Sequence, residues 1–160
     1  MKRALLTLVI VLNLVALDGV VKEVAAKFLK DAAAISVVPG LFNLAYVENR
    51  GCAWGLFQGQ VWPLAVFGAL ALAFLVWQRR SVFHQPASIL GAIAEPLLYA
   101  GIVGNLLDRI CRGYVIDMFD FYWKSHHFPC FNVADTLICV SVGLLILASC
   151  LSPAYSEARR

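Results

Sequence analysis

The sequence predicts an all-α membrane protein: a four-transmembrane-helix bundle with a small extracytoplasmic β-sheet and an interfacial amphipathic helix. Hydrophobic residues make up 61% of the 160-residue chain and charged residues only 14%, well below the ~25% of a typical soluble domain. Four apolar spans each approach the ~20 residues that a membrane helix needs: 4–21, 61–77, 87–107 and 133–151. Since little else fits in this length, we expect a single integral membrane domain, residues 1–160.

Short basic segments flank these spans and predict their orientation. Lysine and arginine in short loops favour the cytoplasmic side, so both termini and the 78–86 loop are predicted to be cytoplasmic. The basic residues concerned are Lys2, Arg3, Arg79, Arg80, Arg159 and Arg160. A cleaved signal peptide is the alternative for the first span. Against it, the cleavage motif is poor, and Asp18 and Lys22 have the look of functional residues.

The stretch after the first span predicts an amphipathic helix on the membrane surface, followed by a strand. Its apolar residues follow the i, i+3, i+4, i+7 spacing of one helix face: Ala25, Phe28, Leu29 and Ala32. Pro39-Gly40 predicts a turn. Residues 41–49 are rich in strand-forming side chains and end before Gly51, so we expect a small sheet that caps the mouth of the bundle.

The polar residues near the spans gather at one membrane face. Charges so close to hydrocarbon are costly, and by default they indicate a functional site. The residues are Asp18, Asn49, Asn105, Asp108, Arg109, Asp117, Asn132 and Asp135. Lys22 lies four residues after Asp18 and shares a helix face with it. An interfacial ion pair explains these two residues as well as a role in a site does.

Asn132 and Asp135 open the fourth span and lie on one helix face. A helix N-cap followed by a first-turn acid is the simple structural explanation. Asp135, however, precedes an apolar helix, where an unpartnered carboxylate is costly. Asp117 ends the alternating apolar run 113–117, which predicts an extended segment tucked against the bundle. Asp117 and Asp135 are therefore expected to meet at the outer mouth.

Two carboxylates in one partly dry site cannot both ionise easily, so one keeps a proton while the other acts as a base. Such a pair can deprotonate a water that attacks an amide and protonate the leaving nitrogen. The pair titrates as a unit, so neither Asp117 nor Asp135 is assigned a fixed role. A metal site is not expected, because the adjacent His126 and His127 point in different directions and no third ligand is evident.

Five sequence blocks together resemble the lipoprotein signal peptidases, the signal peptidase II family, in order over most of the chain. They are Asp18 with Lys22, Asn49-Arg-Gly51, Gly104-Asn-Leu-Leu-Asp-Arg109, Val115-Ile-Asp117 and Phe131-Asn-Val-Ala-Asp135. The resemblance implies a bacterial aspartyl peptidase of the cytoplasmic (inner) membrane, with its active site at the outer face. Such an enzyme cuts diacylglyceryl-modified prolipoproteins before the lipidated cysteine and uses no metal or organic cofactor.

By motif position, the resemblance implies that Asp117 and Asp135 are catalytic. The implied supporting residues are Asp18, Lys22, Asn49, Gly51, Asn105, Asp108, Arg109 and Asn132. Of these, Arg109 is expected to face the site and Asp108 the loop. The expected partners are lipid-modified prolipoproteins and membrane lipids. A net charge of +3 is too small and dispersed to suggest nucleic-acid binding, and we expect a monomer.

Some residues depart from this pattern. Glu95-Pro96 interrupts the third span, two to three turns below the outer face, so no catalytic role is expected for it. Asp120 ranks below Asp117, because the family's Val-x-Asp pattern fits only the latter. Cys111 and Cys130 share an outer loop and are candidates for a disulfide.

Three rival functions stay open at this point. A small transporter or proton relay needs polar residues strung through the bilayer, whereas here only Glu95 lies deep. A disulfide-forming quinone reductase needs paired cysteines in its outer loops, and the first outer loop holds only Cys52. A non-catalytic assembly factor is the third. Exchange of Asp117 or Asp135 for asparagine distinguishes all three from a peptidase.

Overall fold

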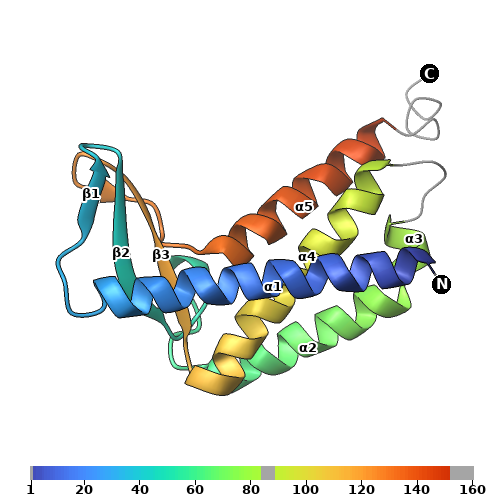
Figure 1. Ribbon diagram of the computed structural model, residues 1–160, viewed down its shortest axis with the longest axis horizontal. Coiled ribbons are helices and arrows are strands. Elements are labelled where there is room, and N and C mark those ends of the chain that lie inside the picture. The colour runs from blue at the N-terminus through green and yellow to red at the C-terminus, as the bar shows by residue number, and fades with distance from the viewer. Residues whose placement is uncertain (1, 84–88, 152–160) are drawn as a thin grey trace.

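The computed structural model describes residues 2–83 and 89–151, in which crossing helices carry an antiparallel sheet at one end (Figure 1). The helices are α1 (Lys2–Leu29), the short 3₁₀ helix η1 (Ala53–Gly55), α2 (Val61–Trp77), α3 (Arg79–Phe83), α4 (Ile89–Arg112) and α5 (Val133–Cys150). The strands are β1 (Ile35–Val38), β2 (Phe42–Asn49), β3 (Val115–Trp123) and β4 (His126–His127), which pair in the order β1-β2-β3-β4. The start of α1 and the end of α5 lie at the end of the molecule away from the sheet.

Within the described ranges, three helices are long and apolar enough to cross a membrane: α1, α4 and α5. α2 is also apolar but has 17 residues, at the lower end of spanning length. Its bounds are those predicted for the second span. α4 continues five residues past the predicted end of the third span at position 107, so Asp108, Arg109 and Arg112 belong to its last turns. The first two residues of that predicted span, 87 and 88, lie outside the described residues.

The separate interfacial helix expected after the first span does not form, since residues 22–29 are the last turns of α1. Ala25 and Leu29 are buried because they pack against Ile116 and Met118 of β3. Of the apolar stripe expected from the sequence, Ala25 and Leu29 therefore face the sheet, whereas Phe28 and Ala32 are exposed. The predicted strand over 41–49 is confirmed as β2.

α4 is the central helix, in contact with α1, α2, α3, α5 and β3. Small residues allow its neighbours to approach closely. A Cβ atom on Gly101 would lie 2.5 Å from the carbonyl oxygen of Ala134, at the start of α5. This proximity places the polar end of α4 directly beside the first turn of α5.

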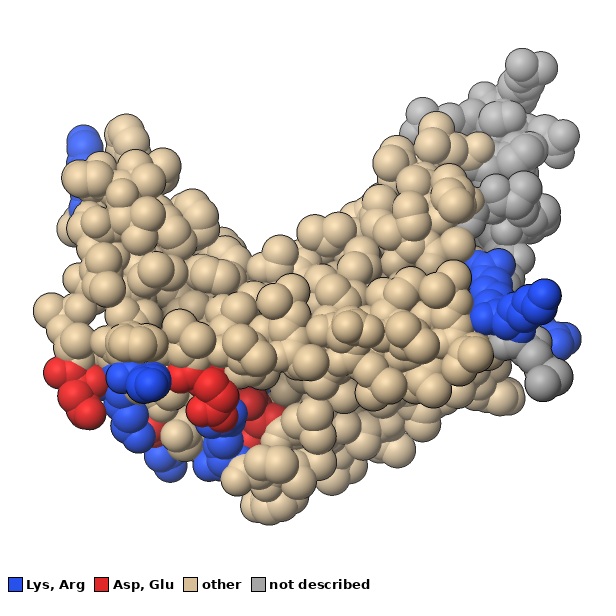
Figure 2. All heavy atoms as spheres, in the orientation of Figure 1, with Lys and Arg blue, Asp and Glu red and all other residues tan. Residues whose placement is uncertain are grey.

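The surface divides into charged ends and an uncharged middle. In Figure 2, charged side chains gather near the sheet and at the opposite end of the molecule, and a broad uncharged band separates them. The same view shows a deep notch between the sheet and α5. A membrane protein needs such an apolar band where it meets hydrocarbon.

Candidate active site

All ten residues that the sequence predicts for the site join one network of hydrogen bonds and ion pairs. The network lies where α1, α4, β3 and the start of α5 meet, and it reaches β2 and the η1 loop. Its members are Asp18, Lys22, Asn49, Gly51, Asn105, Asp108, Arg109, Asp117, Asn132 and Asp135. Residues up to 116 positions apart in the sequence are thus in direct contact.

Lys22 is the cationic centre of this network and is fully buried. Its Nζ atom lies 2.7 Å from Asp18 Oδ2, 2.9 Å from Asp108 Oδ2 and 3.2 Å from Asn105 Oδ1. An ammonium group has three N–H donors, so these three acceptors satisfy it completely. That satisfaction offsets the large cost of removing the charge from water.

Asp18 ties α1 to the first turn of α5. Its Oδ1 atom accepts a hydrogen bond from the backbone N–H of Ala134 at 2.9 Å, one of the first-turn amides that have no partner within their own helix. A Cβ atom on Gly104 would lie 2.6 Å from Asp18 Oδ2. Only glycine at this position lets the carboxylate lie so close to α4.

Asp108 directs its carboxylate toward α1 and toward β3, which lies in the segment expected to be an outer loop. Besides Lys22, it accepts a hydrogen bond from Arg112 Nε at 3.0 Å and from the backbone N–H of Ile116 at 3.4 Å. Because Ile116 immediately precedes Asp117, Asp108 helps to fix the backbone that carries the first catalytic candidate.

Asn132 and Asp135 form a capping box at the start of α5. Asn132 Oδ1 accepts from the N–H of Asp135 at 2.9 Å, and Asp135 Oδ2 accepts from the N–H of Asn132 at 3.2 Å. The other carboxylate oxygen of Asp135 accepts from Asn105 Nδ2 at 2.7 Å. The simple capping explanation is therefore correct, and the same two side chains also belong to the network.

Asp117 is almost completely buried, and each of its carboxylate oxygens accepts a side-chain amide. Asn132 Nδ2 donates to Oδ1 at 2.7 Å and Asn49 Nδ2 to Oδ2 at 3.0 Å. Burial, and next the negative charge of Asp135, raise the pKa of Asp117 to about 7, against the opposing effects of the two asparagines and Lys22. Near neutral pH, a proton is therefore readily held on this pair of carboxyl groups.

Arg109 lines two cavities together with Asn105, and so faces the site as expected from the sequence. Its guanidinium donates to the carbonyl oxygen of Gly51 at 3.0 Å and to that of Asn105 at 3.2 Å. A Cβ atom on Gly51 would lie 2.4 Å from the carbonyl oxygen of Leu56, so the η1 loop can fold this tightly only with glycine there. The arginine thus holds the η1 loop against α4.

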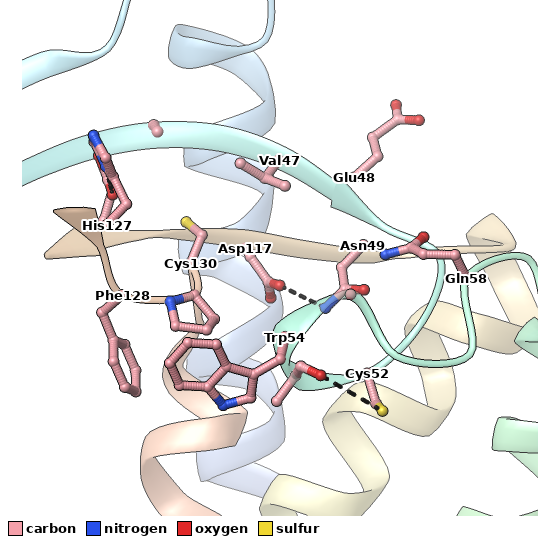
Figure 3. Close-up of a pocket in the computed structure, with 15 residues that line it drawn as sticks. Val47, Glu48, Asn49, Cys52, Trp54, Gln58, Asp117, His127, Phe128 and Cys130 are labelled. Atoms are coloured by element: carbon pink, nitrogen blue, oxygen red, sulfur yellow. Dashed lines mark hydrogen bonds and ion pairs between the residues drawn. The ribbon is translucent and has the colours of Figure 1, made fainter. Parts of the chain in front are cut away.

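Three cavities open on this network. Asp117 and Asp135 both line one of about 420 Å³, whose other wall includes apolar residues of α5. A cavity of about 850 Å³ lies mainly between α2 and α4 and ends at Asn105 and Arg109. The third, of about 580 Å³, follows the sheet away from Asp117 (Figure 3). Both carboxyl groups therefore border the same cavity, although Asp117 itself is almost completely buried.

Trp54 and Phe128, which sequence reasoning did not select, line both cavities that contain Asp117. Their rings meet edge to face with centroids 5.8 Å apart, and Figure 3 shows them below Asp117. The five cysteines are all free thiols, so the candidate disulfide between Cys111 and Cys130 is not formed. Burial raises the pKa of the Cys130 thiol to about 12, which keeps it neutral.

Glu95 is buried outside this network and outside the three cavities. It forms an ion pair with Arg79 of α3. Ten residues of helix, or about 15 Å, separate it from Asn105. This placement agrees with the depth expected for Glu95, and the absence of a catalytic role stays a prediction.

Together, the fold and site define a helical membrane protein in which two carboxyl groups line one cavity. This combination is suited to hydrolysis by acid–base chemistry. The family model for signal peptidase (SPase) II matches residues 10–151. The lipoprotein signal peptidase of Syntrophotalea carbinolica is 40% identical over 144 residues, which cover 88% of each chain. That of Symbiobacterium thermophilum is 39% identical over 145 residues, 89% of this chain and 93% of the relative.

A solved structure, described as a bacterial membrane enzyme, superposes with a TM-score of 0.77 at 30% sequence identity, covering 89% of this chain and 86% of the other. The chain therefore belongs to the signal peptidase II family and is a membrane peptidase. The family predicted from the sequence blocks is confirmed.

Proposed function

We propose that this chain is an aspartyl endopeptidase that removes the signal peptide from diacylglyceryl-modified prolipoproteins, cutting before the lipidated cysteine. One observation carries the proposal: Asp117 and Asp135 line the same cavity, and Asn132 bonds to both of them. Two carboxyl groups held in this way supply the acid and the base that amide hydrolysis needs.

In the proposed reaction the pair begins with one proton. The ionised carboxylate removes a proton from water, and the water oxygen attacks the carbonyl carbon before the cysteine. The protonated carboxyl then gives its proton to the amide nitrogen as the carbon–nitrogen bond breaks. The products are a carboxylic acid on the signal peptide and a free amino group on the cysteine, and the pair again holds one proton.

Asn105 and Asn132 would fix the positions of the two carboxyl groups relative to each other during these proton transfers. Lys22 donates to Asn105 Oδ1, so the Nδ2 group of that amide must be the one directed at Asp135. Asn132 in turn donates to Asp117 and to Asn105 Oδ1. We therefore assign Asp18, Lys22 and the two asparagines to positioning.

Arg109 would hold the substrate. A guanidinium has five N–H donors, and its bonds to Gly51 and Asn105 fix it beside two of the cavities. Its remaining donors can bind a carbonyl oxygen of the substrate backbone. The apolar cavities among the helices suit the hydrophobic part of the signal peptide and the acyl chains.

The orientation expected from the sequence fits this assignment. Lys2, Arg3, Arg79 and Arg80 belong to α1 and α3, at the end of the molecule away from the sheet. If that end is cytoplasmic, the network lies at the outer face of the bacterial inner membrane, where a lipid-anchored cysteine is presented. All of the network comes from one chain, so a monomer is sufficient for activity.

The test is cleavage of a diacylglyceryl-modified prolipoprotein by the purified full chain in detergent, with the products identified by mass spectrometry. We expect a product that begins at the lipidated cysteine, and no such product from the unlipidated precursor or with Asp117→Asn. Failure of the folded parent chain to cleave, or a cut elsewhere, would overturn the proposal. In that case a transporter and a non-catalytic assembly factor would become the favoured hypotheses.

A further inference from the structure

The cavity along the sheet extends beyond the residues that the reaction uses. Asp117 lies within it, and Asp120 and His127 line it as well. Figure 3 places His127 at one end, Asn49 and Gln58 toward the other, and Asp117 and Cys130 between them. The cavity therefore extends from Asp117 along the sheet, on the side away from the membrane helices.

A bulge in β3 brings both aspartates into this cavity. The backbone N–H groups of Met118 and Phe119 both donate to the carbonyl oxygen of Phe131, at 3.0 and 2.9 Å. Two successive N–H groups that donate to one carbonyl oxygen are typical of a β-bulge, which changes the direction of the side chains that follow it. Residues three apart on a regular strand face opposite sides, and the bulge allows Asp117 and Asp120 to line the same space.

Asp120 lies at the far end of the cavity and has two polar partners. Asn43 Nδ2 donates to its Oδ2 at 2.9 Å, and His127 Nδ1 lies 2.7 Å from its Oδ1. Its side chain keeps 13% of its surface exposed, enough to contact a bound molecule. The imidazole of His127 is half exposed and stacks on Tyr122.

Glu48, the remaining acid that lines this cavity, is already balanced. It pairs with Arg50 at 3.2 Å and Lys30 at 3.7 Å, and it points away from the cavity in Figure 3. Within the described residues, Asp120 pairs with an imidazole and not with a lysine or arginine, so it is the acid beyond the catalytic pair that can discriminate charge in a bound peptide.

The geometry points to a binding site for the first residues of the mature chain. This site favours a basic over an acidic side chain at the third or fourth residue of the mature chain. The inference rests on the proposed function. The apolar cavities receive the signal peptide and the lipid, so the mature chain must leave along the sheet. Asp117 and Asp120 lie three residues apart on β3, so the third or fourth residue of an extended peptide that follows this strand would lie beside Asp120.

Charge discrimination at this place would act in both directions. A lysine or arginine would share the Asp120 carboxylate with His127 in a partly dry cavity, whereas a glutamate would face like charge. Partly exposed ion pairs and hydrogen bonds to charged groups contribute modest energies, so we expect a preference of about ten-fold for lysine over glutamate.

The test uses the purified full chain and three lipid-modified prolipoproteins that carry lysine, glutamine or glutamate at both the third and fourth mature positions. We expect kcat/KM to fall in that order, and Asp120→Asn to bring the lysine-to-glutamate ratio close to one. His127→Gln removes the competing partner and should increase the ratio. Asp31→Asn, which removes an exposed acid beyond the end of α1, should leave the ratio unchanged.

Each ratio is measured within one variant, so a general loss of stability cancels. Equal use of the lysine and glutamate substrates by the parent chain would overturn the inference, as would a preference that Asp120→Asn does not change. Either result leaves the proposed function standing, because cleavage itself is then observed. Absence of cleavage with all three substrates would overturn the proposed function and this inference with it.

Discussion

Near the start of α4 the carboxylate of Glu95 pairs with Arg79, and near its end the carboxylate of Asp108 pairs with Lys22. Both acids are buried and both have a basic partner from another helix. Charged residues in an apolar span indicate a functional site, so hydropathy alone predicts a site equally at both places.

The two places differ in what the charges connect to. From Lys22, hydrogen bonds lead through Asn105 and Asn132 to two further carboxyl groups on the wall of a cavity. Glu95 contacts α3 and does not line the cavities that open on the network. A buried charge therefore marks the site only where a connected polar network carries it to an accessible surface. The following variants test that distinction.

Among the residues that support the two aspartates, the largest effect is expected for Asn132→Ala. Asn132 caps α5 and donates to Asp117, so its loss releases one carboxyl group and weakens the helix that carries the other. A misplacement of about 1 Å can cost a hundred-fold in rate, and we expect kcat to fall by about that factor. Ser149→Ala removes a hydroxyl near the opposite end of α5 and should change kcat less than about two-fold. Equal effects of the two variants would contradict the network.

Gly104→Ala should lower both stability and activity. The added Cβ atom would meet Asp18 Oδ2 at 2.6 Å and push the carboxylate away from the N–H of Ala134. Overpacking of this kind costs about 1–3 kcal/mol, and we expect kcat to fall by about ten-fold. Gly143→Ala is the matched control, because nothing lies within 4 Å of its added Cβ atom. The two variants are compared by thermal unfolding in detergent and by cleavage.

The pH dependence of cleavage should reflect the shared proton. The pKa of Asp117 is about 7, and the pair must hold one proton to act, so kcat/KM should fall about four-fold between pH 6 and pH 7.5. A raised pKa in the folded state stabilises the fold at low pH, and this stabilisation is lost as the pH rises from about 4 to about 7. In Asp117→Asn the corresponding loss of thermal stability should be absent. A rate independent of pH up to 9 would contradict the shared proton.

The smallest effect on cleavage is expected at the other end of α4. Glu95→Gln keeps the shape of the side chain and removes its charge opposite Arg79. We expect kcat/KM to change by less than about two-fold, and the thermal unfolding midpoint to fall, because a charged hydrogen bond contributes about 1.5–3 kcal/mol. A large loss of activity with unchanged stability would place Glu95 in the mechanism.

The sequence predicted the members of the network better than their contacts. Helical spacing and motif order selected Asp117, Asp135 and their supporting residues, because those patterns are local. The bond from Ala134 to Asp18 joins residues 116 positions apart, and no local pattern contains it. The bulge that places Asp120 in a cavity depends on Phe131 accepting two hydrogen bonds, which is again a tertiary feature.

The continuous α1 was missed for a similar reason. Its apolar stripe at Ala25 and Leu29 has the same spacing whether it faces lipid or the sheet, and only packing against Ile116 decides between the two. The partner of Glu95 was also unforeseen, because Arg79 lies in a short helix where the sequence indicated only a loop.

The most direct test of the central claim is to compare three carboxyl-to-amide variants, Asp117→Asn, Asp135→Asn and Glu95→Gln, in the same detergent with the same lipid-modified substrate. We expect kcat/KM to fall by about a thousand-fold or more in the first two, with all three proteins folded, and to stay within about two-fold in the third. Cleavage retained by either aspartate variant would contradict the assignment of the catalytic pair. Loss of cleavage in all three would contradict the distinction between the two ends of α4.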